Sequence, residues 1–138
     1  MSITNLYCTL TFYSDSERFE MNDFQSKLKI SQKRSWTIGD LQRPDLEESK
    51  RPDSSVVVMS DVSEDNDGTN MIVDFFKYLI SKKEEILFLG KKYKADMSFD
   101  IVVNLESCDS PIIILNQDQL VFLAEIGAKL NCSVYDYK

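Results

Sequence analysis

In residues 6–13, apolar side chains occupy every second position, as they do in a β-strand with one buried face. This pattern constrains the fold most. β-Branched and aromatic residues dominate the segment, as strands prefer. One face would carry only apolar side chains, those of Leu6, Cys8, Leu10 and Phe12. A strand with one apolar face must be covered by another layer of structure.

Four further segments are predicted to form strands. Residues 55–60 are a short β-branched run, and residues 99–105 alternate between apolar and polar side chains. A turn at 108–111 leads to an apolar run at 112–115, so we expect these last two strands to form an antiparallel hairpin. Residues 130–135 are predicted to form the final strand.

Two helices are predicted before the hairpin. A short one begins near Phe24, with Asn22 or Asp23 as its N-cap. The longest helix of the chain runs from Met71 to about Leu89, because its apolar residues recur on one face. Gly90 is predicted to end it, as glycine often does.

A third helix is predicted over Gln117–Ile126, with Asn116 as its N-cap and Gly127 as its end. The expected order of elements is therefore β-α-β-α-β-β-α-β. Strands at both ends with helices between them indicate an α+β fold, with helices packed on a mixed, largely antiparallel sheet.

Length and composition favour a single domain over residues 1–138. The hydrophobic fraction of 43% and the charged fraction of 28% are ordinary for a globular chain of 138 residues. Residues 40–54 are polar, contain Pro44 and Pro52 and carry charges of both signs. We interpret them as a loop within the domain.

The chain contains no histidine, which excludes Ser-His-Asp and Cys-His catalysis and His-ligated metal sites. None of its four glycines belongs to a phosphate-binding motif. Sixteen Lys and Arg stand against 23 Asp and Glu, a net charge of −7. Such a chain is unsuited to nucleic acid, since that affinity comes from Lys and Arg. We expect a protein without enzymatic activity, cofactor or nucleic-acid partner.

Cysteine use and the N-terminal sequence predict a cytoplasmic protein. The chain has three cysteines, an odd number, and no two of them have CxxC spacing: Cys8, Cys108 and Cys132. This argues against a disulfide framework and against a zinc ribbon. The first residues lack the basic and apolar regions of a signal peptide. No apolar run approaches the ~18 residues of a membrane span, so we expect no membrane association.

The acidic turn before the longest helix partly fits a calcium loop. With Gly68 at the sixth position, Ser63, Asp65 and Asp67 fall at the first, third and fifth, and Asp74 at the twelfth. Calcium loops favour Asp at the first position and a bidentate Glu at the twelfth. We therefore predict no metal site, and interpret the segment as a solvated turn whose charges stabilise the helix N-terminus.

Two acidic groups flank the strand at 55–60 and are predicted to bind a partner. Glu47 and Glu48 precede the strand, and Glu64, Asp65 and Asp67 follow it. If the strand is short, both groups frame one negative face, which would attract a basic partner and speed association. The alternative is that the charge only keeps the protein soluble.

Trp36 is the only tryptophan. It would either lie at the rim of the core with its indole nitrogen hydrogen-bonded, or anchor a partner from an exposed position. We include it among the predicted partner-binding residues.

Two motifs occur together in a recognisable order. Ser35-Trp36-Thr37-Ile38-Gly39-Asp40 follows the first strand and short helix, and the chain closes on Leu120-x-x-Leu123-Ala124-x-Ile126-Gly127-Ala128-x-Leu130-x-Cys132-x-Val134-Tyr135. This arrangement resembles the bacterial domain-of-unknown-function family numbered 4279, over almost the whole chain. Members often carry a second Trp on the strand after the loop, where this chain has Val56 to Met59. The resemblance implies a small stand-alone protein, sometimes encoded near secreted toxins, and no known chemistry.

These observations lead to two expectations about function. The first is a non-enzymatic cytoplasmic protein-binding domain, an immunity protein that neutralises a basic, nuclease-like toxin by covering its anion-binding site. The second is a small-ligand or calcium-binding module. The sequence leaves the oligomeric state open.

Overall fold

The computed structural model describes residues 5–64, 68–105 and 113–136 of the chain. Its sheet consists of β1 (Asn5–Ser14), β2 (Ser54–Met59), β3 (Asp96–Leu105) and β4 (Ala128–Asp136), in the order β2-β1-β3-β4. β1 is antiparallel to both of its neighbours, whereas β3 and β4 are parallel. The predicted α+β fold with a mixed, largely antiparallel sheet is confirmed.

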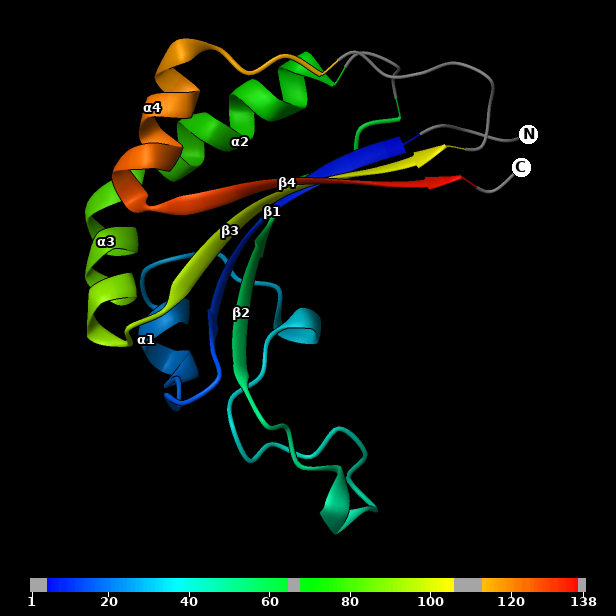
Figure 1. The fold of residues 1–138 in the computed structure, drawn as a ribbon, viewed down its shortest axis with the longest axis vertical. Helices are drawn as coiled ribbons and strands as arrows, with labels where there is room; N and C mark the ends of the chain where they lie inside the picture. Colours follow the sequence, from blue (N-terminus) through cyan, green and yellow to red (C-terminus); the bar gives the residue numbers. More distant parts are fainter. Residues whose placement is uncertain (1–4, 65–67, 106–112, 137–138) are drawn as a thin grey trace.

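Four α-helices lie on one side of the strongly curved sheet (Figure 1). They are α1 (Met21–Gln25), α2 (Thr69–Ser81), α3 (Lys83–Lys92) and α4 (Gln117–Ile126). Two short 3₁₀ turns, η1 (Gln32–Arg34) and η2 (Glu47–Ser49), lie between α1 and β2 in the chain. Within the described ranges, none of the helices combines the length and apolar character needed to cross a membrane.

The core forms where the alternating face of β1 meets the helices. Its four apolar residues are completely buried, as the period of two predicts: Leu6, Cys8, Leu10 and Phe12. Phe12 packs edge-on against Phe24 of α1, and Phe99 of β3 lies 4.8 Å from Phe76 of α2, measured between ring centroids. Each buried side chain of this size contributes roughly 1.5–3 kcal/mol, which is what holds the helices to the sheet.

The predicted helix over 71–89 is two helices. The chain bends at Lys82, whose backbone lies outside the helical region (φ −107°, ψ 16°), and α3 then continues to Lys92. Gly90 therefore does not end a helix. It lies inside α3, at a point where β3 passes close by. A Cβ atom at this position would collide with Cε of Met97.

The predicted hairpin at 99–115 is also wrong in its second strand. Residues 113–116 form no strand and lead into α4, while the proposed turn, including Cys108, lies outside the described residues. Besides β1, the strand that pairs with β3 is β4, and the chain reaches it through α4. A parallel pair needs a crossover of this kind, which explains the change from the predicted order.

The boundaries of α4 are confirmed. Oδ1 of Asn116 accepts a hydrogen bond from the Gln119 backbone N–H, and Oε1 of Gln119 accepts one from the Asn116 N–H, both at 2.9 Å. Gly127 ends the helix in the left-handed conformation (φ 73°). By contrast, α1 begins at Met21, earlier than predicted, and neither Asn22 nor Asp23 caps it.

Candidate functional site

The chain leaves β2 through a local shift in register against β1. Thr9 pairs with Met59, but Leu6 pairs with Ser63, so the β2 side contains one extra residue. Asp61 and Val62 lie in this bulge and both are exposed. Bulges redirect side chains and are common beside binding sites.

Gly68, the residue directly before α2, lies close to β1. Leu6 and Ser63 exchange two backbone hydrogen bonds of 2.8 Å, which holds the chain against β1. A Cβ atom at Gly68 would lie 2.7 Å from Cδ1 of the completely buried Leu6. The chain can therefore approach β1 this closely only because residue 68 has no side chain.

A cavity of about 670 Å³ lies between the bulged segment and α2. The helix contributes side chains at spacings of one, three and four residues, which places them on one face: Asn70, Met71, Asp74, Phe75 and Tyr78. The opposite wall is formed by Lys29 and by the end of β2 with the bulge, residues 58–64.

The cavity combines apolar walls with a negative rim. Val62 and Met71 give the cavity apolar surface that a ligand can reach, above the buried Val58 and Phe75. The carboxylates of Asp61, Glu64 and Asp74 are exposed. Among the described lining residues, Lys29 is the only cation. Its backbone N–H donates a 2.8 Å hydrogen bond to the Tyr78 hydroxyl, which ties this wall to α2. Apolar walls suit an alkyl chain, and a carboxylate rim suits a cationic head.

Of the three rim carboxylates, the sequence predicts only Glu64 as a partner-binding residue, and Asp74 enters only as the twelfth position of the calcium loop. Nothing in the sequence shows that Asp61 faces α2. Asp74 lies four residues from both Asn70 and Tyr78, and this helical spacing is the sequence signal that the three residues share one face of the helix. Asp65 and Asp67 lie outside the described residues.

The structure describes no metal site. Its residues contain no group of three or more Asp, Glu or Cys side chains placed to hold an ion. Of the calcium-loop positions, Ser63 and Asp74 lie on opposite walls of the cavity, and Asp65 and Asp67 lie outside the described residues.

Glu47 and Glu48 do not share a face with Glu64. They belong to η2, in the loop before β2, and the strand carries the chain away from them to the opposite end of the molecule (Figure 1). Contrary to the prediction from the sequence, Glu64 therefore does not frame one negative face with Glu47 and Glu48. β2 runs its whole six-residue length between them.

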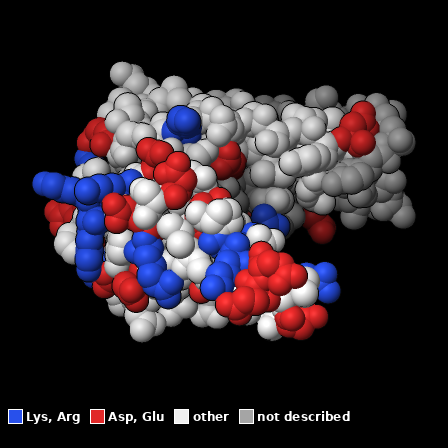
Figure 2. Space-filling view, turned by 60° about the horizontal axis from the view of Figure 1, so that its bottom comes forward, with Lys and Arg blue, Asp and Glu red and all other residues white. Residues whose placement is uncertain are grey.

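The loop before β2 also carries its own cations. Glu47 pairs with Lys50 at 3.0 Å, and Asp45 lies 3.9 Å from Arg43. Figure 2 shows basic and acidic side chains interspersed over the face that it presents. Because these ion pairs are exposed, they contribute little to the free energy of unfolding. Their basic residues, Arg43 and Lys50, nevertheless offset part of the negative charge of the loop.

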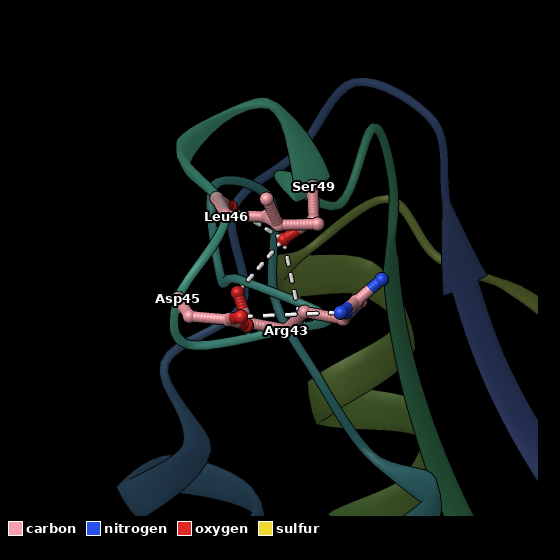
Figure 3. A network of polar contacts seen from close by, with 4 residues as sticks. All are labelled: Arg43, Asp45, Leu46 and Ser49. Carbon is pink, nitrogen blue, oxygen red and sulfur yellow. Dashed lines mark hydrogen bonds and ion pairs between the residues drawn. The ribbon is translucent and has the colours of Figure 1, made fainter.

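The turn that presents Glu47 and Glu48 is built around Ser49 (Figure 3). The Ser49 hydroxyl donates to the backbone carbonyl oxygens of Leu46, at 2.6 Å, and Arg43, at 3.0 Å. It also accepts a 3.1 Å hydrogen bond from the Arg43 backbone N–H. These bonds account for the geometry of the turn without a ligand.

Trp36 is partly buried, and its polar atom has a partner. The indole N–H donates a 2.8 Å hydrogen bond to Asp53, and the Arg51 guanidinium lies 3.9 Å from the ring centroid. Its backbone bridges to Ser55 of β2. These are the contacts of an aromatic residue at the rim of the core. A role in partner binding stays a prediction.

Comparison with known proteins gives one match. No curated protein and no solved structure matches the chain. A family model described as a domain of unknown function, DUF4279, matches residues 4–137, which is nearly the whole chain. The resemblance noted in the sequence is thereby confirmed, and the protein belongs to the DUF4279 family.

Proposed function

We propose that this protein is a non-enzymatic cytoplasmic binding domain for a basic protein, an immunity protein that neutralises a basic, nuclease-like toxin. Its cavity between the bulge and α2 receives a lysine or arginine side chain of the partner. The alkyl stem lies against Val62 and Met71, the apolar lining residues that a ligand can reach, and the charged head lies among the rim carboxylates.

The observation that carries this proposal is the pairing of apolar walls with a three-carboxylate rim, Asp61, Glu64 and Asp74. An acidic surface that serves only solubility needs no cavity behind it. The loop acids Glu47 and Glu48 do not line this cavity, and Glu47 already pairs with Lys50. We therefore assign the partner contact to the cavity end of the molecule.

A titration with a lysine-rich peptide, followed by amide chemical shifts, tests this proposal. We expect shifts concentrated at residues 58–64 and 70–78. The variant Glu64→Lys/Asp74→Lys should bind at least tenfold more weakly, because it places like charges at the rim. The matched control Glu47→Lys/Glu48→Lys makes the same change in net charge at the other end of β2.

The outcomes separate the interpretations. Weakened binding in the cavity variant alone supports the proposal. Equal weakening in both variants would show a non-specific effect of net charge, and weakening in the loop variant alone would move the site to η2.

A small cationic ligand is the second candidate, because a cavity of about 670 Å³ lies in the ~300–1,000 Å³ range of small-molecule sites. Spermidine and calcium chloride are suitable probes in a thermal-unfolding assay. A rise in Tm with spermidine, lost in Glu64→Lys/Asp74→Lys, would favour this candidate. A rise with calcium alone would favour the calcium-binding alternative.

A further inference from the structure

The two edges of the sheet differ in how they are protected. Beside β2, Ser31 donates a 2.7 Å backbone hydrogen bond to the Val57 carbonyl oxygen, and Trp36 and Ser55 exchange two more. The chain between α1 and β2 therefore occupies that edge. Within the described ranges, β4 pairs only with β3, so its outer edge faces no other strand.

β4 lacks the usual features that prevent edge pairing. It runs in unbroken register from Ala128 opposite Met97 to Asp136 opposite Leu105, without a bulge. It contains no proline, and its only charged residues, Lys129 and Asp136, lie near its two ends. Proteins normally protect a long edge strand with charges, proline or bulges.

The core-facing side of β4 is apolar and exposed. Leu130 is 47% exposed although its neighbour Phe99 on β3 is completely buried, and Val134 is 56% exposed although its neighbour Val103 is 2% exposed. Cys132, between them on the same face, is also exposed. The helices thus cover the apolar face of β1 and β3 but not that of β4.

We propose that the outer edge of β4 pairs antiparallel with β4 of a second copy of this chain, about a two-fold axis through Cys132. The two sheets then form one continuous eight-stranded sheet. In this register Leu130 lies opposite Val134 of the second copy, and Cys132 lies opposite Cys132. This surface is separate from the cavity, and the proposal does not depend on the proposed function.

The sequence of β4 is complementary to itself around Cys132. A two-fold axis perpendicular to the sheet keeps the apolar face of both strands on the same side, so Leu130, Cys132 and Val134 of the two copies form one apolar row. On the other face, Lys129 lies opposite Tyr135, a cation beside an aromatic ring. Asn131 lies opposite Ser133, whose hydroxyl can donate to the Asn131 amide oxygen. This pairwise match is why we assign a second copy as the occupant.

Oxidative cross-linking of the full-length chain with copper–phenanthroline tests the register. Opposed residues of antiparallel strands have Cα atoms about 4.5–5.5 Å apart, which suits a disulfide. We expect a Cys132–Cys132 cross-linked dimer, identified by peptide mapping in a Cys108→Ser background. Cys8 should not react, because burial raises the pKa of its thiol to about 12.

Moving the cysteine provides the control. In a Cys132→Ser/Cys108→Ser background, Leu130→Cys alone should not cross-link, because the two copies of residue 130 would lie about 14 Å apart. Mixing the Leu130→Cys and Val134→Cys proteins should restore the cross-link. Equal cross-linking of Leu130→Cys alone would indicate random collision and overturn the proposal.

Sedimentation over a range of concentrations provides an independent test without oxidant. Val134→Lys should weaken dimerisation at least tenfold while leaving Tm nearly unchanged, because residue 134 is already half exposed. A protein that stays monomeric at the highest concentration, or a Val134→Lys variant that dimerises like the natural chain, would overturn the proposal.

Discussion

The Tyr93 hydroxyl at the end of α3 donates a 2.5 Å hydrogen bond to the Asp23 carboxylate in α1. Lys92 pairs with the same carboxylate, and the Tyr93 ring stacks on Phe24 with centroids 5.2 Å apart. A five-residue helix is too short to be stable in isolation. These contacts therefore hold α1 in place against the core.

Asp23→Asn should lower the thermal stability at neutral pH, and the difference should depend on pH. The hydrogen bond from Lys92, and then that from Tyr93, lower the pKa of Asp23 below its ordinary value of 3.8. A carboxyl group with a lowered folded-state pKa stabilises the fold above its unfolded-state pKa and loses that effect as the pH falls through the folded-state value.

Calorimetry from pH 7 to pH 2 measures this effect. The difference in Tm between the natural chain and Asp23→Asn should be constant near neutrality and narrow as the pH falls below about 4. Asp15→Asn, an exposed carboxylate, is the control and should change Tm little. A difference that does not vary with pH would contradict the role given to the Asp23 carboxylate.

Gly68→Ala should destabilise the protein by about 1–3 kcal/mol, because the new methyl group meets the buried side chain of Leu6. Chemical denaturation measures the change. Gly90→Ala is the informative comparison, since the new methyl group there meets the flexible end of Met97 and alanine favours the helix by about 1 kcal/mol. Equal losses for both variants would contradict the tight approach of residue 68 to β1.

Asn116→Ala should cost about 1 kcal/mol in unfolding free energy, because it removes the capping box of α4. Gln117→Ala, at the next position and exposed, should be nearly neutral. Urea denaturation of the two variants measures the difference directly. Equal stability of the two variants would show that the cap contributes nothing.

Trp36→Phe should cost about 1 kcal/mol through loss of the hydrogen bond to Asp53. If that bond is the cause, the double variant Trp36→Phe/Asp53→Ala should lose less than the sum of the two single changes. Affinity for the lysine-rich peptide should not change. A loss of affinity without a loss of stability would instead identify Trp36 as a partner anchor.

Local patterns predicted the elements whose boundaries local chemistry sets. The period of two located the buried face of β1, and Asn116 and Gly127 marked both ends of α4. The hairpin prediction failed because the partner of β3 is chosen by tertiary packing and arrives through α4. The prediction that Gly90 ends a helix is wrong because the close approach of Gly90 to Met97 exists only once helix and sheet are packed together.

The candidate site was predictable only in part. The acidic character of the segment after β2 is enough to predict Glu64 as a binding residue. The separation of Glu47 and Glu48 from the bulge depends instead on the course of β2. The bulge at Asp61 arises from a change in register that no residue pattern announces. The cavity therefore required the pairing of β1 with β2 to be known.

Capture of a partner from the native host tests the central claim most directly. Tagged natural chain, Glu64→Lys/Asp74→Lys and Glu47→Lys/Glu48→Lys are compared at low and moderate salt, with the bound proteins identified by mass spectrometry. We predict that the natural chain and the loop variant capture the same basic protein, that salt weakens the capture, and that the cavity variant loses it. Capture of that protein by all three chains, or by none, would contradict a basic partner bound at the cavity.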